Sequence, residues 1–202
     1  MVEIRDIKQA LRGMMNGIVS HSMREKGANY KVNFGVELPR LQAFAEELRA
    51  SLGEGGRAYR LALQLWNEPI RECRLLAGML MPVAEMDRPT SELWVEQMQL
   101  AEEAECTVFH LFQHLPYAAD LAFGWIASER PMHQLCGWLL MARLFMQGKE
   151  PSERDAAEIL DQAAVCLASP NLQLASSAQK AVLKYMALSP EAEARGEKLL
   201  GQ

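Results

Sequence analysis

The sequence predicts an all-α protein, and three observations support this fold class. Apolar residues recur at three- and four-residue intervals along nearly the whole chain, as they do on one face of a helix. Most connections between these segments are short and marked by proline or glycine. No stretch of alternating apolar and polar residues is flanked by hairpin-turn residues, so no β-sheet is expected.

We expect about ten helices. The apolar stripes that predict them follow in chain order: Ile4–Ile18, Leu61–Trp66, Ile70–Leu80, Leu93–Ala101, Val108–Leu115, Leu121–Ile126, Leu135–Met146, Ala156–Leu167 and Leu172–Leu188. Pro69 and Pro82 mark the ends of two of them, because proline cannot continue a helix. Ser152 and Ser189 have the sequence context of N-caps, and Pro190 stands at a first helical position.

Consecutive antiparallel helices can form either an irregular bundle or a stack of hairpins. The segment Leu135–Met146 is apolar almost all round, and Gly137 would allow a close backbone approach, as expected for a helix between neighbouring repeats. A rhythm of roughly 40 residues fits HEAT-like units. We therefore predict an α-α superhelix of HEAT-like helical hairpin repeats in one domain over residues 1–202. An irregular globular all-α domain is the alternative.

The composition is that of an ordinary globular protein, with 50% hydrophobic and 23% charged residues. Charges are scattered through the first 13 residues, so we expect neither a signal peptide nor a membrane anchor there. No CxxC pair occurs, and each cysteine has an apolar, helix-like context, which favours buried, reduced thiols in a cytoplasmic protein. The four cysteines are Cys73, Cys106, Cys136 and Cys166.

The net charge of −5 is unevenly distributed. Residues 1–74 carry 12 Lys/Arg and 9 Asp/Glu, whereas residues 75–128 carry one arginine and 8 acids. Residues 129–202 are nearly balanced, with 8 basic and 9 acidic side chains. A nucleic-acid-binding domain usually has a basic face, and only the first third of this chain is rich enough in basic residues to supply one.

Two stretches carry a resemblance to a known family. They read "NYKVNFGVELPRLQAFAEEL" (Asn29–Leu48) and "LALQLWNEPIRECRLLAGMLM" (Leu61–Met81). The first contains a Gly-Val-x-x-Pro pattern that opens a helix, and the second a Leu-Trp pair followed by Glu-x-Arg-x-Leu-Ala. In order, spacing and overall length the chain resembles AlkD-like DNA alkylation repair proteins. Both motifs are chiefly structural, since Gly35 and Pro39 would shape a turn.

The resemblance implies HEAT-like repeats that curve around duplex DNA. Active members are glycosylases that release positively charged alkylated purines. Because such a base is already a good leaving group, the chemistry chiefly needs a carboxylate that stabilises positive charge developing on the sugar, and aromatic walls around it. Active members supply these as a Trp followed four residues later by an Asp, with an Arg and another Trp from a later repeat.

This sequence departs from the family pattern at those positions. Aligned through the shared Thr-Val, the family Trp becomes Glu105 and the catalytic Asp becomes Phe109. The later repeat reads "PMHQL" where active members begin a helix with Trp-x-Arg-Arg, and Arg143 lies two to three turns further on. Glycosylase activity is therefore left open. A one-turn slip would bring another carboxylate to the sugar, from Glu102, Glu103 or Glu105, and Glu105 is the candidate catalytic residue.

Cys106, His110 and His114 are spaced by four residues, as metal ligands on one helix can be. On a helix over residues 105–115 they would share, with Gln113, the face opposite a buried stripe of Val108, Leu111, Phe112 and Leu115. Cys106 and His114 would lie about 12 Å apart along the axis, too far to bind one zinc ion together. A polar helix face is the favoured interpretation, and a metal, ligand or DNA contact there is the alternative.

No phosphate loop, nucleophile elbow or paired zinc motif occurs, so we expect no cofactor and no metal. Basic side chains that could contact DNA phosphates are Arg24, Lys26, Lys31, Arg71, Arg74 and Arg143. A solvated basic face is the alternative for them.

The tryptophans, expected in the core, are Trp66, Trp94, Trp125 and Trp138. The second hypothesis for function is a helical-repeat scaffold that binds a protein or peptide, motivated by the acidic middle segment.

Overall fold

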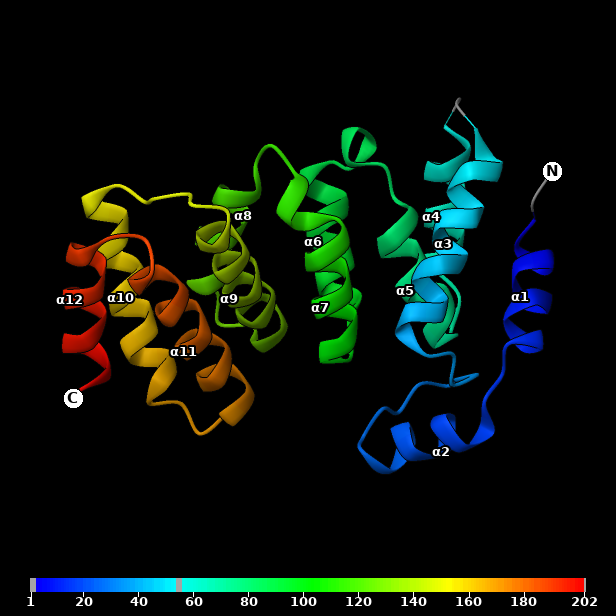
Figure 1. Ribbon diagram of the computed structural model, residues 1–202, viewed down its shortest axis with the longest axis horizontal. Coiled ribbons are helices and arrows are strands. Elements are labelled where there is room, and N and C mark those ends of the chain that lie inside the picture. The colour runs from blue at the N-terminus through cyan, green and yellow to red at the C-terminus, as the bar shows by residue number, and fades with distance from the viewer. Residues whose placement is uncertain (1–2, 54–55, 202) are drawn as a thin grey trace. The chain divides into compact units, whose positions relative to one another are not determined.

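A computed structural model describes residues 3–53 and 56–201 of the chain (Figure 1). These residues form twelve α-helices, two short 3-10 turns and no β-strand, apart from one isolated bridge between Val32 and Ile70. The predicted all-α fold class is confirmed. The chain divides into two compact units, Met1–Asp87 and Arg88–Gln202, and each is considered by itself.

Unit 1 is built around a helical hairpin. Its helices are α1 (Ile4–Gly13), α2 (Gly17–Glu25), α3 (Leu38–Leu52), α4 (Arg57–Trp66) and α5 (Arg71–Leu80), followed by a 3-10 turn, η1 (Val83–Glu85). Helices α4 and α5 pack against each other, with α3 against both and α1 against α4. Helix α5 is the centre of this unit, because nine of its ten residues are buried.

The single helix expected over Ile4–Ile18 is two helices. Helix α1 ends at Gly13, and Asn16 caps α2 by accepting a hydrogen bond from the backbone N–H of Val19 through its side-chain oxygen. Asparagine is a preferred N-cap residue, and its cap starts a new helix axis. Ile18 therefore leaves the stripe defined by Ile7 and Leu11, and its side chain is 85% exposed.

Unit 2 is a set of hairpins around one central helix. Its helices are α6 (Arg88–Gln97), α7 (Ala101–His110), α8 (Ala118–Ile126), α9 (Pro131–Met146), α10 (Glu153–Leu167), α11 (Leu172–Met186) and α12 (Pro190–Leu200), with a 3-10 turn, η2 (Phe112–His114), after α7. Helix α9 packs against α6, α7, α8 and α11. This explains why its sequence is apolar almost all round.

Two helix boundaries in unit 2 differ from the expected ones. The stripe Leu93–Ala101 spans a break at residues 98–100, where the buried Glu103 carboxylate accepts a hydrogen bond from the backbone N–H of Gln99 at 2.8 Å. The helix expected over Val108–Leu115 ends at His110. The backbone leaves helical geometry at Leu111, with φ −128° and ψ −66°, and Pro116 then keeps Leu115 extended, because the residue before a proline is driven out of helical geometry. Leu115 has φ −69° and ψ 141°.

The predicted N-caps are confirmed. The Ser152 hydroxyl accepts from the backbone N–H of Asp155 at 3.1 Å, and the Ser189 hydroxyl accepts from that of Ala192 at 3.2 Å. Each bond satisfies an N–H group that the first helical turn leaves without a backbone partner. The four tryptophans are buried as expected, with 0–3% of each side chain exposed.

Gly137 allows α8 and α9 to approach closely, as predicted. A Cβ atom at this position would lie 2.7 Å from the backbone nitrogen of Ile126 and 3.0 Å from the carbonyl carbon of Trp125. These are backbone atoms and cannot rotate away, so a larger residue would force the helices of this hairpin apart.

We expect Gly137→Ala to lower the free energy of unfolding by about 1–3 kcal/mol, the usual cost of overpacking. Urea denaturation followed by circular dichroism measures this change. Gly124→Ala on α8 is the matched control, because no atom lies within 4 Å of its Cβ position. Alanine there should be neutral or stabilising by up to about 1 kcal/mol, since it replaces glycine in a helix. Equal effects of the two substitutions would contradict the close approach.

Candidate nucleic-acid interface

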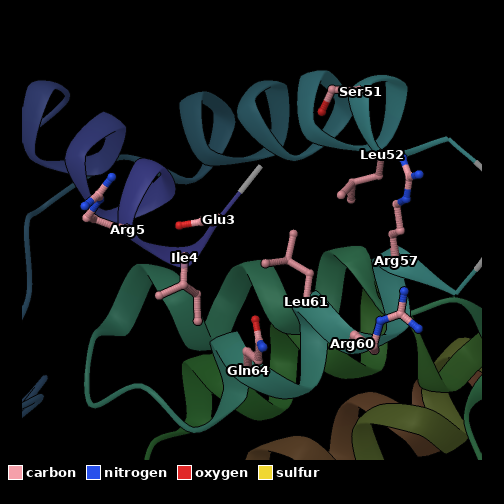
Figure 2. A pocket seen from close by; sticks show the side chains of 9 residues that line it. All are labelled: Glu3, Ile4, Arg5, Ser51, Leu52, Arg57, Arg60, Leu61 and Gln64. Carbon is pink, nitrogen blue, oxygen red and sulfur yellow. The ribbon is translucent and has the colours of Figure 1, made fainter. Parts of the chain in front are cut away.

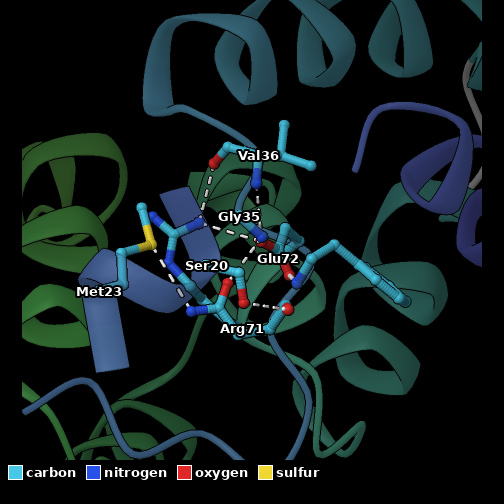
Figure 3. A network of polar contacts seen from close by, with 8 residues as sticks. Ser20, Met23, Gly35, Val36, Arg71 and Glu72 are labelled. Atoms are coloured by element: carbon cyan, nitrogen blue, oxygen red, sulfur yellow. Dashed lines mark hydrogen bonds and ion pairs between the residues drawn. The ribbon is translucent and has the colours of Figure 1, made fainter. Parts of the chain in front are cut away.

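Arg71, a predicted phosphate contact, lies in the core of unit 1. Only 1% of the residue is exposed, and its Nη1 donates to the carbonyl oxygen of Val36 at 2.9 Å and to Glu72 Oε1 at 3.1 Å (Figure 3). In this arrangement its guanidinium cannot reach a phosphate outside the protein. Glu68, which precedes α5, binds Lys8 of α1 at 2.6 Å.

Glu72 holds the irregular segment 33–36 against the start of α5. Its two carboxylate oxygens accept from the backbone N–H groups of Phe34 and Val36, each at 3.1 Å. Gly35, between them, has φ +72°, and a Cβ atom there would lie 2.3 Å from the backbone oxygen of Asn16. We call this set of contacts between residues 33–36, Arg71 and Glu72 the carboxylate clasp. The two motifs that carry the family resemblance therefore bind each other.

Arg74 is only partly available to a ligand. Its guanidinium carbon lies 4.3 Å from the centre of the Trp66 ring, and its Nη1 donates to the Trp66 carbonyl oxygen at 3.4 Å. A guanidinium over an indole face is stabilised by the ring quadrupole. This side chain joins the end of α4 to α5.

The remaining basic candidates of unit 1 lie in one stretch of sequence and are exposed. Arg24 is in the last turn of α2, and Lys26 and Lys31 follow in the irregular segment that leads to the carboxylate clasp. Among the residues that the structure describes, none of the three forms an ion pair. Exposed, unpaired cations are what contact with a DNA backbone requires.

No single helix face carries the predicted polar stripe of Cys106, His110, Gln113 and His114, because α7 ends at His110. Cys106 is buried in α7, and Gln113 is buried in the η2 turn, with 6% and 5% exposed. His110 is half-buried and His114 is exposed. The prediction of a solvent-facing polar stripe was wrong for Cys106 and Gln113, because α7 is covered on more than one side and the chain turns inward after His110. The predicted buried stripe of Val108, Leu111, Phe112 and Leu115 is confirmed.

Gln113 links the end of α7 to the end of α9. Its Nε2 donates to the carbonyl oxygen of Phe109, and its Oε1 accepts from Arg143 Nε at 2.9 Å and from Gln147 Nε2 at 3.1 Å. Both lone pairs of this amide oxygen are thus used. Arg143, the predicted contact of unit 2, is therefore held by a buried amide.

The position of the family carboxylate is occupied by a ring beside a cation. The guanidinium carbon of Arg143 lies 4.7 Å from the centre of the Phe109 ring, which is 46% exposed rather than packed in the core. Glu105 lies one turn earlier on α7 and is exposed. Glu103, another carboxylate considered for the sugar, is 2% exposed and accepts a hydrogen bond from the backbone N–H of Gln99, just before α7.

A hollow of about 990 Å³ lies in unit 1 between α1, the end of α3 and the start of α4 (Figure 2). Arg5, Arg57 and Arg60 line it together with apolar side chains that include Leu52 and Leu61. Sequence reasoning missed these arginines because they lie outside both motifs. The sequence did hold a signal for them: Arg57 and Arg60 fall in the first turn of α4, where the helix dipole disfavours positive charge, so a role other than helix stabilisation was to be expected.

Several acidic side chains of the middle segment have partners within unit 2. Glu92 accepts from Trp125 Nε1 at 2.8 Å and lies 3.3 Å from Nε2 of the buried His133. Two further ion pairs join helices of this unit, Arg88–Asp120 and Arg130–Glu96. The side chains of Asp120, Glu96 and Glu92 nevertheless stay 66%, 47% and 46% exposed.

Within residues 3–53 and 56–201, no group of three or more His, Cys, Asp or Glu side chains could hold a metal ion. In the same residues, no helix combines the length and apolarity that a membrane crossing requires. All four cysteines are buried, and none of them forms a disulfide in the described part of the chain. Burial raises the pKa of the Cys73 thiol to about 12 and also raises the pKa of Cys136 and of Cys166. These thiols are thus held in the neutral, unreactive form.

Hairpins of α-helix without strands, joined by short connections, define a helical-repeat protein. The sequence matches the family described as DNA alkylation repair enzyme over residues 7–183, and the protein belongs to this family. The predicted family is thereby confirmed.

Among solved structures, the chain is similar to a member of "a new family of proteins related to the HEAT-like repeat DNA glycosylases with affinity for branched DNA structures". The TM-score is 0.80 at 14% sequence identity, over 98% of this chain and 82% of that one. This likeness confirms the predicted HEAT-like fold. No curated protein matches the sequence.

The carboxylate clasp should dominate the stability of unit 1. We expect Glu72→Gln to lower its free energy of unfolding by about 3–5 kcal/mol, because Arg71 would remain as a buried charge without its partner. Urea denaturation followed by circular dichroism measures the loss.

Glu47→Gln on α3 is the matched control, since Glu47 is exposed and the same charge is removed. It should change the free energy of unfolding by no more than about 0.5 kcal/mol. If both variants unfold at the same urea concentration, the clasp does not stabilise the unit.

Proposed function

We propose that the protein binds double-helical DNA and does not act as a glycosylase through the family carboxylate. The observation that carries this proposal is the side chain at the family's catalytic position, where Phe109 stands against Arg143. Membership of the DNA alkylation repair family supports DNA as the partner. The exposed, unpaired Arg24, Lys26 and Lys31 supply cations for its backbone.

The chemistry of base release opposes an active site at Phe109. Loss of a cationic purine leaves positive charge on the sugar, which a nearby carboxylate would stabilise. Phe109 has no charge to offer, and the adjacent guanidinium of Arg143 would repel the developing cation. Glu105 is one turn away and would have to reach the sugar past this pair.

The structural neighbour's affinity for branched DNA supports a wider substrate range than a regular duplex. We propose that branched DNA is among the forms bound. Because backbone contacts depend on charge and shape rather than on sequence, binding should not require a particular base sequence.

The alternative function, a scaffold for a protein or peptide, rested on the acidic segment 75–128. Glu96 pairs with Arg130, which lies outside the segment, and Glu103 is buried, so the exposed negative charge is smaller than the sequence count. This weakens the charge argument against DNA. Salt-sensitive DNA binding separates the two functions, since the scaffold requires none.

We also propose that the two units act as one domain over residues 1–202, in the cytoplasm. The family match supports the first point, because it continues across the boundary between the units. The four buried cysteines, which are not joined in disulfides, support a reducing compartment.

The triple variant Arg24→Gln, Lys26→Gln, Lys31→Gln should bind a short duplex more weakly, and its affinity should depend less on salt. Each lost phosphate contact reduces the slope of log K against log [salt] by about 0.9, so we expect a reduction of up to roughly 3. Fluorescence anisotropy at several salt concentrations measures it. The charge-matched control replaces three exposed lysines of unit 2, Lys180, Lys184 and Lys198, by glutamine. A wild-type protein without salt-sensitive binding would count against the proposed function.

The protein should not release N7-methylguanine from duplex DNA above the spontaneous rate. The reason is the missing carboxylate at position 109, and chromatography of the released base measures the rate. Release by the wild type would contradict this proposal. In that case Glu105→Gln decides whether a displaced carboxylate is responsible, because it should abolish the activity while leaving the fold intact.

A further inference from the structure

Phe109 stands apart from the other aromatic side chains of the protein. Among the described Phe, Tyr and Trp residues it is the most exposed, at 46%, although its neighbours Val108, Leu111 and Phe112 are buried. An aromatic ring on the surface forgoes the free energy of burial that the rest of the turn gains. Its exposed area is a flat apolar surface on a rigid element.

The guanidinium of Arg143, next to this ring, is held at its Nε atom and keeps its other nitrogens available. Gln113 binds only the Nε atom of Arg143, and the buried amide is itself held by Phe109 and Gln147. At its other end, Nη1 of Arg143 contacts Met146 Sδ at 3.9 Å, a weak acceptor. Within the described part of the chain, Arg143 forms no ion pair. A guanidinium held at one nitrogen keeps its remaining N–H groups for an anion.

We propose that Phe109 and Arg143 form a binding site for an unpaired nucleobase of DNA. The base stacks on the Phe109 ring, and Arg143 binds the phosphate of the same nucleotide. This inference rests on the proposed function, DNA binding, and adds the kind of nucleotide recognised. Stacking on an aromatic side chain tolerates every base, because each base has a π-face.

The charges around the ring favour a neutral base over it. The His110 and Phe109 rings are nearly perpendicular, at 82°, with centres 4.8 Å apart, so the imidazole does not stack flat on the Phe109 ring. Glu105 lies one turn earlier on α7 and would repel a phosphate that approached from its side. A base, which carries no net charge, suffers no such penalty, and the phosphate of its nucleotide finds the guanidinium of Arg143 at the same ring, 4.7 Å from the ring centre.

Such a site would distinguish DNA with unpaired bases from a regular duplex. Taking a base out of a paired stack costs a few kcal/mol, whereas a bulge or branch point offers a base that is already free. The site would therefore contribute to binding of branched or bulged DNA and contribute little on a fully paired duplex.

The test compares two short duplexes of the same sequence, one fully paired and one with a single bulged 2-aminopurine. Stacking on Phe109 should quench the 2-aminopurine fluorescence, and the wild type should bind the bulged duplex about tenfold more tightly than the paired one. Phe109→Leu should remove both the quenching and the preference, whereas its affinity for the paired duplex should stay within about twofold. Phe109→Trp, which keeps an aromatic face, should retain both.

Leu183→Ala is the control, since Leu183 is 49% exposed on α11 of the same unit and should affect neither DNA. Circular dichroism and thermal unfolding show whether each variant folds. If the wild type binds both duplexes equally, or if Phe109→Leu keeps the preference, this inference is overturned while the proposed DNA binding stands. If the wild type binds neither duplex, both are overturned.

Discussion

A buried carboxylate organises unit 1. Glu72 is fully buried, yet it is matched by two backbone N–H groups and by the guanidinium of Arg71. Burying a charge is costly unless every partner is present, so the surrounding chain has little freedom to rearrange. The segment 33–36 has no helix or sheet of its own, and this carboxylate supplies the hydrogen bonds that secondary structure would otherwise provide. Ser20 extends the arrangement to α2 by donating its hydroxyl to the Asn33 carbonyl oxygen.

The two units use arginine in different ways. In unit 1, Arg71 is enclosed by the fold, and its role is to complete a buried arrangement of charges. In unit 2, Gln113 fixes Arg143 through one nitrogen and leaves the guanidinium beside an exposed ring. A neutral amide can orient a cation without neutralising it, whereas a carboxylate in the same place would do both. This difference separates a structural arginine from one that is available to an anion.

Much of the fold follows from local sequence signals. Ser152, Ser189 and Gly137 act as predicted because capping and close packing depend on a few neighbouring atoms. The misplaced residues are those whose environment is set by distant parts of the chain. The surroundings of Arg71 come from residues about 35 positions away, which no helical period reveals. Gln113 lies in the η2 turn, after α7 has ended at His110, so a projection onto one straight helix assigned it to the wrong face.

The carboxylate clasp has a consequence for the order in which the protein forms. Its bonds join residues 36 and 38 positions apart in the chain. During translation the segment 33–36 emerges from the ribosome before residue 72 does, so for that interval it lacks the partner that defines its shape. A chaperone, or a slow stretch of synthesis, that acts within this interval would meet an exposed, unanchored loop. The timing of nascent-chain folding in unit 1 is therefore set by the arrival of a single acidic side chain.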